Sequence, residues 1–148
     1  MNKLQGMRLP AIIAFTAFFC LSPCAATAQS QLEVVIKNIR NDKGNIRLGV
    51  FKDKTTFLKT AVLGKVVKAQ KGQITIVIDD IPPGTYAVSV IHDEDGNGEL
   101  STNFAGIPKE GFGFGNDAMG TFGPPSFAKA SITVESGKKA TSISLRYF

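Results

Sequence analysis

Cysteine and histidine are nearly absent from this sequence, and their scarcity excludes whole classes of site. The chain has two cysteines, Cys20 and Cys24, both within its first 28 residues, and one histidine, His92. A domain that starts after residue 28 therefore has neither a thiol nor a disulfide, and its core alone must hold it together. Such a domain also lacks the ligands for a zinc site, because a single histidine without cysteines is not enough.

Long apolar runs are absent as well. The longest one, 9–21, falls short of the roughly 20 residues that a membrane-spanning helix requires. Lys3 and Arg8 precede it, and the small residues Ala26-Thr27-Ala28 follow it. A basic start, a short apolar segment and a small-residue triplet are the layout of a secretory signal peptide.

We therefore predict a cleavable signal peptide over residues 1–28, with cleavage after Ala28, and one mature domain over residues 29–148. The mature protein is expected to be periplasmic or secreted and to have no membrane span. Two alternatives stay open. In the first, the apolar segment remains uncut as an anchor. In the second, Cys24 is processed as a lipoprotein cysteine, for which Pro23 is a poor neighbour.

Runs of basic residues are missing from the mature part of the chain. Without Lys3 and Arg8, the chain has 15 basic and 12 acidic residues and a net charge of +3. The basic residues are scattered and do not alternate with aromatic residues that could stack on bases. We therefore expect a solvated basic surface and no nucleic-acid partner.

What the sequence does contain is an alternation of apolar and polar residues with a period of two, which is typical of half-buried strands. We expect strands in the segments 31–39, 45–52, 65–70, 73–79, 85–92, 128–135 and 141–147. These segments predict an all-β fold class, an antiparallel Greek-key β-sandwich of about seven strands with one long ordered loop.

Turn residues predict three hairpins among these strands. The first two segments are joined by 41–44, the next two by Lys71-Gly72, and the last two by 136–139. In the connection 53–64, we expect Phe57 or Leu58 to contact the core.

The segment 93–127 is predicted to be the long ordered loop, because long loops in compact domains are usually functional and this one is rich in aromatic residues. Five of the 11 phenylalanines lie in it: Phe104, Phe112, Phe114, Phe122 and Phe127. We expect these rings to cap one end of the sandwich, with the glycines of 111–115 letting the chain fold back onto the sheet. The alternative is an exposed aromatic platform for a sugar or a peptide.

Asp93, Asp95 and Asn97 alternate ahead of Gly98 and Glu99, as ligands do in the first half of a calcium-binding loop. Oxygens at alternate positions point inward, the glycine permits a sharp turn, and the next carbonyl, that of Glu99, can add a backbone ligand. We predict that these residues contact Ca²⁺ or a similar hard cation.

An EF-hand is not expected, because Phe104 occupies the position of the bidentate glutamate and no helices flank the loop. The completing carboxylate would come from Glu94, Glu99, Glu110 or Asp117. We place Asn103 and Glu110 behind the first ligands. The structural alternative is an Asx-rich turn, in which the same side chains bond to nearby backbone amides.

The same segment also supports an enzymatic alternative, a metal-assisted or acid/base hydrolase that uses His92, Asp93 and Glu110. That function requires the three side chains to converge in a cleft. A serine hydrolase is not expected, because no serine lies in a nucleophile elbow. The glycines of 111–115 likewise lack the Gly-Lys-Ser/Thr ending of a phosphate-binding loop.

A long motif block occupies this part of the chain. It contains His92-Asp93-x-Asp95-x-Asn97-Gly98, then Asn103-x-x-Gly106-Ile107-Pro108-Lys109-Glu110-Gly111-Phe112-Gly113-Phe114-x-Asn116, then Phe122-Gly123-Pro124-Pro125-Ser126-Phe127. The block resembles an uncharacterised bacterial family, known only as domain of unknown function 2141. The resemblance spans the mature chain and implies an exported single domain with a transthyretin-like, or prealbumin-like, β-sandwich. It implies no activity.

Two positions depart from the family pattern. Members often carry an aspartate where this chain has Ser101, and a serine where it has Gly115. The first departure removes one potential cation ligand.

Together these patterns predict an exported, non-enzymatic binding or structural module of the cell envelope, with the 93–127 loop as its working surface. Its cofactor would be Ca²⁺, and its partner an envelope protein or a glycan. The remaining hypothesis is a purely structural or oligomerising domain without a ligand.

Overall fold

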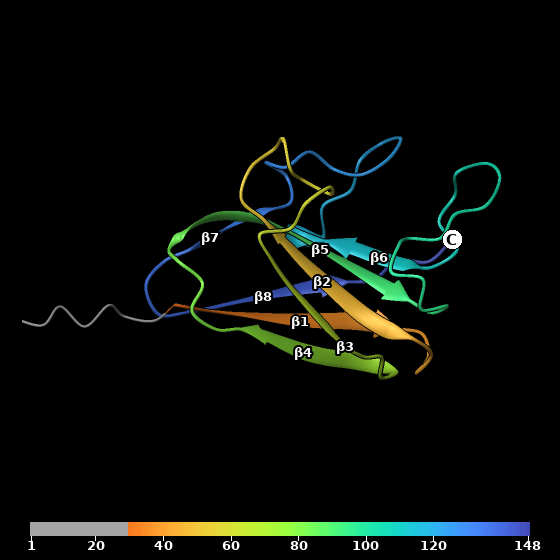
Figure 1. The fold of residues 1–148 in the computed structure, drawn as a ribbon, viewed down its shortest axis with the longest axis horizontal. Coiled ribbons are helices and arrows are strands. Elements are labelled where there is room, and N and C mark those ends of the chain that lie inside the picture. Colours follow the sequence, from red (N-terminus) through yellow and green to blue (C-terminus); the bar gives the residue numbers. More distant parts are fainter. Residues whose placement is uncertain (1–29) are drawn as a thin grey trace, which may run out of the picture.

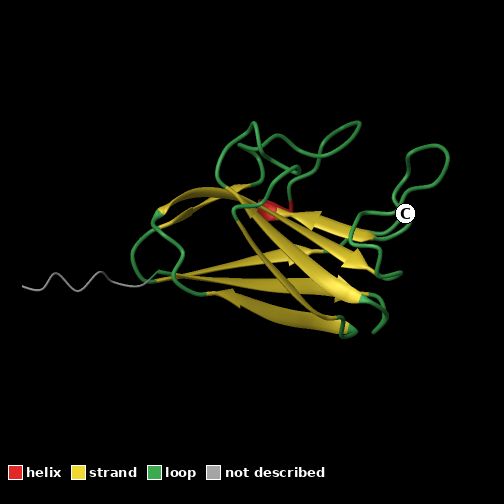
Figure 2. Cartoon of the chain, viewed as in Figure 1, coloured by secondary structure: helices red, strands yellow, loops and turns green. Residues whose placement is uncertain are grey.

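The computed structural model describes residues 30–148, so the predicted signal peptide, its cleavage site and both cysteines lie outside the described residues. Within 30–148, eight strands form two facing sheets (Figures 1 and 2). The strands are β1 (Gln31–Ile39), β2 (Asn45–Phe51), β3 (Leu63–Lys68), β4 (Gly72–Ile78), β5 (Gly84–Asp93), β6 (Gly111–Phe114), β7 (Ser131–Val134) and β8 (Lys138–Ser144). A short 3-10 turn, η1 (Gly115–Asp117), follows β6, and no helix in the described part is long and apolar enough to span a membrane. The predicted all-β sandwich is confirmed, with eight strands in place of about seven.

The two sheets differ in size. One has the strand order β4-β1-β8, and the other has the order β3-β2-β5-β6, with β7 also paired to β5. Along β5, Gly84–Ala87 pairs with β7 and Ser89–His92 pairs with β6, so that the two short strands share one edge of β5. The pairs are antiparallel apart from β1 with β8, which run parallel.

The three predicted hairpins are wrong, because each of those connections crosses from one sheet to the other. β1, β4 and β8 lie in the smaller sheet, whereas β2, β3 and β7 lie in the larger one. Alternation within a strand identifies its buried face but does not identify its neighbour. Near the end of β1 the register shifts between Ile36 and Ile39, and Asn38 takes a φ of 61°. A bulge of this kind increases the local twist and redirects the strand towards the other sheet.

The main core fills the space between the two sheets. It includes fully buried residues from both layers: Leu32, Val34 and Ile36 of β1, Ile46 and Val50 of β2, Val88 of β5 and Ile143 of β8. These side chains are the apolar members of the alternating segments. Their removal from water is the main favourable contribution to the stability of a domain without disulfides.

A second cluster of aromatic residues covers the outer face of the larger sheet. Ala87 belongs to this cluster, whereas its neighbours Tyr86 and Val88 belong to the main core, because successive residues of a strand point to opposite faces. The other buried members of the cluster are Phe51, Phe112, Phe114 and Ala130, and Phe57, Leu100, Met119 and Phe127 pack against them. The expected contact of Phe57 is confirmed, since its ring lies edge-on to that of Phe51 at 5.4 Å.

The predicted aromatic cap is only partly correct. Phe112, Phe114 and Phe127 pack in the second cluster, as expected. Phe104 and Phe122 do not, because their exposed fractions are 105% and 102%. The loops that carry them project away from the sheets (Figure 1).

β6 lies inside the segment that was predicted to be one long loop. Its sequence alternates glycine with phenylalanine, so that the phenylalanines share one face and the glycines the other. A Cβ atom on Gly111 would lie 2.3 Å from the Tyr147 ring, and one on Gly113 would lie 2.6 Å from Ile143. The glycines therefore let β6 pack closely against the C-terminal part of the chain, while Phe112 and Phe114 face the second cluster.

Candidate cation site in the 93–110 loop

The candidate site lies in the loop that connects β5 to β6, residues 93–110, which we call the acidic loop. Asp93 is the last residue of β5, and Glu110 immediately precedes β6. In the ladder between these strands His92 pairs with Gly111, so that Asp93 and Glu110 are brought face to face. Strand pairing thus joins two carboxylates that are far apart in the sequence.

Three carboxylates meet at the base of the acidic loop. Asp93, Asp95 and Glu110 each place an oxygen so that all three atoms lie within 4.8 Å of one another. Asp93 is 0% exposed and Glu110 is 4% exposed, whereas Asp95 is open to solvent. We call these three residues the carboxylate cluster.

Glu110 holds the loop in shape through backbone amides. Its Oε1 accepts hydrogen bonds from the amides of Glu94 at 2.8 Å and Asp95 at 3.3 Å. Its Oε2 accepts one from the amide of Ser101 at 2.9 Å. One side chain thus fixes both the first turn and the far side of the loop.

Asp93 plays a similar part in the first turn. Its two carboxylate oxygens accept hydrogen bonds from the amides of Gly96, at 2.8 Å, and Gly98, at 3.0 Å. Both glycines take positive φ values, 76° and 86°, which other residues adopt only with strain. The guanidinium of Arg47, from β2, lies 3.6 Å from Asp93 and is its one ion-pair partner among residues 30–148.

Asp95 is bound by neighbouring side chains. It accepts a hydrogen bond from the Ser101 hydroxyl at 2.9 Å and two from Asn97, at 3.0 and 3.1 Å. The Ser101 hydroxyl, followed by the Asn97 amide, lowers the pKa of Asp95 below its usual value. Asp95 is therefore ionised at neutral pH. Ser101 thus contributes to the cluster by orienting the Asp95 carboxylate.

The other predicted ligands are placed differently. Asn97 adjoins the carboxylate cluster through its contacts with Asp95 and Ser101, but its own carboxamide oxygen accepts a hydrogen bond from the Glu99 amide at 2.7 Å. The Glu99 side chain is exposed. Asn103 caps its own turn, because its oxygen accepts hydrogen bonds from the amides of Ala105 and Ile107.

Of the four carboxylates considered for completing the site, Glu110 is the one in the cluster. Glu94 instead pairs with Arg40 at 2.6 Å, and Asp117 accepts a hydrogen bond from the Ser144 amide at 2.6 Å, beside the end of β8. Glu99 points to solvent. Glu94 and Asp117 are therefore engaged outside the cluster, and Glu99 is open to solvent.

His92 is enclosed beneath the loop. It is 0% exposed, and its Nε2 lies 2.8 Å from the Lys43 carbonyl. A carbonyl can only accept, so Nε2 carries the proton. Nδ1 then accepts a hydrogen bond from the Tyr147 hydroxyl at 2.9 Å. Both ring nitrogens therefore have hydrogen-bond partners, and neither faces a cleft. The predicted hydrolase required His92 to open into a cleft together with Asp93 and Glu110.

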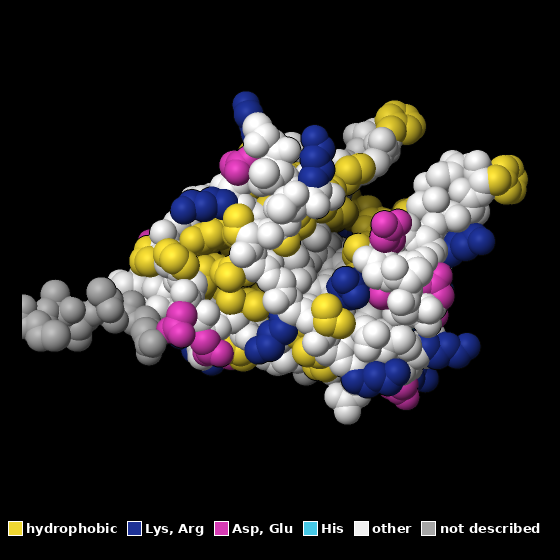
Figure 3. Space-filling view, in the orientation of Figure 1, with side chains coloured by type: hydrophobic (Ala, Val, Ile, Leu, Met, Phe, Trp, Pro, Cys, Tyr) yellow, Lys and Arg dark blue, Asp and Glu magenta, His cyan; other side chains and the backbone are white. Residues whose placement is uncertain are grey.

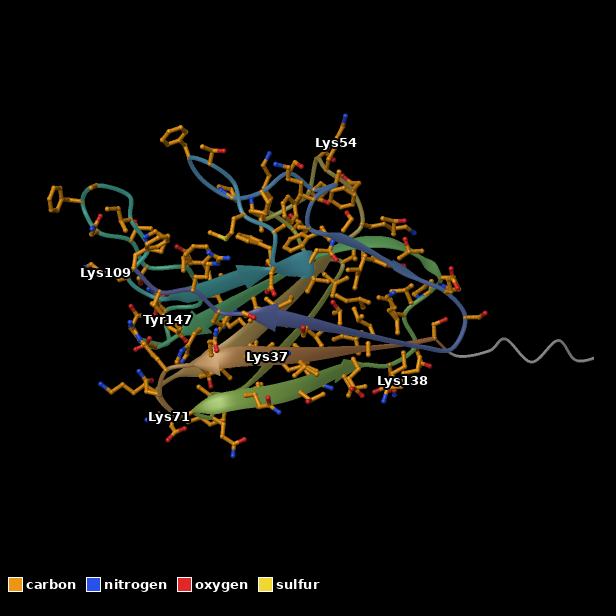
Figure 4. The ribbon with its side chains drawn as sticks, turned by 180° about the vertical axis from the view of Figure 1, so that it is seen from behind. Lys37, Lys54, Lys71, Lys109, Lys138 and Tyr147 are labelled. Atoms are coloured by element: carbon orange, nitrogen blue, oxygen red, sulfur yellow. The ribbon has the colours of Figure 1, made fainter. Side chains whose placement is uncertain are left out.

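Arg40 and Tyr147 support the loop from outside, a contribution that sequence reasoning missed. Arg40 donates to Glu94 and, at 3.1 Å, to the Lys109 carbonyl, and its guanidinium carbon lies 4.5 Å from the centre of the Tyr147 ring. Figure 4 shows Tyr147 and Lys109 at the same end of the sandwich. Burial raises the pKa of Tyr147, so its hydroxyl stays protonated and able to donate to His92. No local sequence pattern predicts these contacts, because the partners come from four separate segments.

Comparisons with known proteins bear on family membership alone. No curated protein and no solved structure matches the chain. A family model described as an uncharacterised protein conserved in bacteria matches residues 34–143, a span that contains both sheets apart from their outermost residues, the acidic loop and all three members of the carboxylate cluster. The chain therefore belongs to this bacterial family, DUF2141.

Proposed function

We propose that the protein is an exported, non-catalytic binding or structural module whose acidic loop takes up a Ca²⁺-type cation. The observation that carries this proposal is the approach of three carboxylates, with oxygens within 4.8 Å, of which two are buried. Asp93, Asp95 and Glu110 would supply the charged ligands. Asn97 and the Glu99 carbonyl would supply neutral ligands.

Charge supports a cation in this place. Like charges repel strongly where water is excluded, and the carboxylate cluster brings together three acidic side chains, two of them buried. Among the described residues, the ion pair that reaches the cluster comes from Arg47 alone, at 3.6 Å from Asp93. A divalent cation would neutralise the remaining negative charge.

The donor set fits a hard cation. Carboxylate, carboxamide and carbonyl oxygens are the ligands that Ca²⁺ prefers, and Ca²⁺ tolerates the irregular geometry of a loop better than Mg²⁺ does. The hydrogen bonds that the carboxylate cluster accepts leave some of its lone pairs free for a cation. An ionised carboxylate has about four lone-pair positions. Asp93 uses two of them for amides, and Asp95 and Glu110 use three each, so all three retain capacity.

The enclosure of His92 supports a non-catalytic function. A general base must reach the proton that it abstracts, and His92 uses both nitrogens for structural hydrogen bonds. The cation would therefore order the loop rather than take part in a reaction. Extracellular modules of this kind bind Ca²⁺ with dissociation constants on the order of 10⁻⁴–10⁻³ M.

The test is thermal unfolding of the purified protein in EDTA, in about 10 mM Ca²⁺ and in Mg²⁺ at the same concentration. A cation that binds only the folded state at this affinity adds about 1.5–3 kcal/mol, or roughly 5–10 °C in Tm for a domain of this size. Asp95→Asn should lose most of the Ca²⁺-dependent rise. Asp95 is the suitable position because it is exposed, whereas Asp93 and Glu110 also hold the loop together.

Glu99→Gln is the matched control, because it removes an exposed acid of the same loop outside the carboxylate cluster. It should retain the full rise. An equal Tm in EDTA and in Ca²⁺ would contradict the cation site. The three carboxylates would then serve only to accept hydrogen bonds within the loop. The domain would be a purely structural or oligomerising one.

The location in the cell envelope is part of the same proposal and has its own test. It is supported by the basic start, short apolar segment and small-residue triplet at residues 1–28. Fractionation of expressing cells, with mass spectrometry of the recovered protein, should find a mature chain that begins at Gln29 in the periplasm or medium. An uncut chain in the membrane fraction, or a lipid on Cys24, would support the alternatives. A partner, an envelope protein or a glycan, would then be sought on the loop side of the sandwich.

A further inference from the structure

Two loops on the same side of the sandwich each end in a fully exposed phenylalanine. We call them the Phe104 loop (residues 100–108) and the Phe122 loop (residues 118–126). The exposed fractions of the two rings are 105% and 102%, so neither ring packs against its own domain. Figure 3 shows both loops projecting beyond the rest of the surface, each with an apolar tip.

The backbone of the Phe104 loop holds its ring outward. Thr102 and Pro108 form an isolated bridge, and the Asn103 amide donates to the Ile107 carbonyl at 2.9 Å. The Asn103 carbonyl in turn accepts a hydrogen bond from the Gly106 amide at 2.9 Å. These contacts close a small turn around Phe104, whose ring is fully exposed.

The Phe122 loop is closed at its neck by a glycine. A Cβ atom on Gly120 would lie 2.4 Å from the Gly123 carbonyl oxygen and 2.6 Å from that of Pro124. The two sides of the loop can therefore approach only because residue 120 has no side chain. Gly123, with a φ of 134°, turns the chain directly after Phe122. In both loops the exposure of the ring is thus a property of the local backbone.

The two loops also share an absence of charge. Residues 100–108 and 118–126 contain no Asp, Glu, Lys or Arg, although 20% of the chain is charged. Charged groups resist transfer out of water far more than apolar or neutral polar groups do. These tips can therefore enter a less polar medium without carrying a charge with them.

Charged residues of both signs stand directly behind the tips. Glu99 and Lys109 flank the Phe104 loop, Asp117 precedes the Phe122 loop, Lys129 follows that loop by three residues, and all four are exposed. Lys54 is exposed as well and projects from the same side of the sandwich as the Phe122 loop (Figure 4). Apolar tips backed by charged groups match the order of layers in a bilayer, where headgroups lie outside the acyl chains.

We infer that Phe104 and Phe122 dock the domain onto a lipid bilayer by inserting into the boundary between headgroups and acyl chains. A protein partner would need two separate pockets at a fixed spacing to receive both rings. A fluid lipid surface adapts to the spacing that the loops impose. This inference does not depend on the cation site, since neither ring belongs to the carboxylate cluster.

The chain contains no tryptophan, which allows a direct test of insertion. Phe104→Trp and Phe122→Trp place a single fluorophore at each tip, and Val66→Trp places one at another exposed apolar position, on β3. Vesicles of phosphatidylcholine with phosphatidylglycerol, added in EDTA, should shift the emission of both tip variants to shorter wavelength. The Val66→Trp variant should show no shift. Equal behaviour of all three would overturn the inference.

Binding to the same vesicles by sedimentation supplies the second readout. Phe104→Ala and Phe122→Ala should each weaken binding by about tenfold, and the double variant should lose it. Val66→Ala should bind like the wild type. All variants share one N-terminal region, so any lipid contact of that region is equal among them. Because both rings are exposed, the Tm of the double variant should stay at the wild-type value.

Two results would overturn lipid docking. One is wild-type binding by the double variant. The other is a wild-type dimer that becomes a monomer in the double variant, measured by sedimentation velocity without lipid, because the rings would then dock onto a second copy of the chain.

Discussion

The carboxylate oxygens of Asp93 and Glu110 approach within 4.8 Å although the two residues stand at opposite ends of the acidic loop. The contact follows from the β5–β6 ladder, in which His92 faces Gly111. Glu110 then binds three backbone amides of the loop, and Asp93 binds two. The same two side chains therefore close the loop and form the buried part of the carboxylate cluster.

Glu110→Ala should destabilise the domain even without a cation. Glu110 is 4% exposed, and its removal leaves the amides of Glu94, Asp95 and Ser101 without their acceptor. Unpaired groups in such a site cost about 1–3 kcal/mol each, less where water reaches them, so we expect a loss of about 2–4 kcal/mol. Urea unfolding in EDTA measures it. Glu99→Ala, at an exposed acid of the same loop, should change the free energy of unfolding by less than about 0.5 kcal/mol.

Glu94 should make the stability of the domain depend on acid pH. Partial burial acts to raise the pKa of this carboxyl, but the hydrogen bonds from Arg40 and Asn41 outweigh burial and hold the pKa below its usual value of 4.5. A folded-state pKa below the unfolded one stabilises the fold above the unfolded value, and the effect is lost as the pH falls through the folded pKa. The wild type should therefore be more stable than Glu94→Gln at neutral pH.

Unfolding measured between neutral and acid pH should show that this difference shrinks as the solution becomes more acidic than the usual pKa of Glu94. Arg40→Gln should reduce the same difference, because Arg40 supplies the bond at 2.6 Å. Glu99→Gln should give a curve parallel to that of the wild type. A difference between wild type and Glu94→Gln that stays constant with pH would show that the Arg40 contact does not act through charge.

The strands were largely predictable from sequence, whereas their partners were not. Seven of the eight strands overlap the predicted segments. The alternation reflects a buried face in most of them, although the edge strand β3 has no buried residue. β6 was missed, although Gly111-Phe112-Gly113-Phe114 also has a period of two. Its alternation sets phenylalanine against glycine, and the need for glycine arises from the close approach of Tyr147 and Ile143, which are distant in sequence.

The candidate site was predictable to a similar degree. Asp93, Asp95 and Asn97 follow from a local spacing, because a turn brings alternate residues together. Glu110 could be considered only as one of four acids, since its place depends on the register of β5 with β6. Arg40 and Tyr147 lay beyond sequence reasoning altogether, because they reach the loop from the end of β1 and from the C-terminus.

Gly113→Ala should destabilise the domain by about 1–3 kcal/mol. Its new Cβ atom would lie 2.6 Å from Ile143, which is 0% exposed, and 3.2 Å from the Ser144 carbonyl oxygen. Neither neighbour can move freely, because Ile143 is part of the core of both sheets. Gly64→Ala is the matched control on the edge strand β3, where the nearest atom would lie 3.3 Å away. Thermal unfolding should show a loss for Gly113→Ala that clearly exceeds that of the control.

Tyr147→Phe should destabilise the domain and loosen the acidic loop. The Tyr147 hydroxyl donates to Nδ1 of the buried His92 and accepts a hydrogen bond from the Arg40 amide at 3.2 Å. Its loss leaves Nδ1 without a partner at a position that water does not reach, which costs about 1–3 kcal/mol. Tyr86→Phe is the comparison, because that hydroxyl bonds only to the Pro82 carbonyl, and its removal should cost less.

Two measurements separate this effect from a general loss of packing. Hydrogen exchange should quicken at the amides that Glu110 binds, since His92 and Tyr147 fix the end of β5 from which the loop starts. The nitrogen shifts of His92 should show a proton on Nε2 in the wild type, because Nε2 donates to the Lys43 carbonyl. Unchanged exchange in the loop of Tyr147→Phe would mean that the ladder between β5 and β6 holds the carboxylate cluster without help from the C-terminus.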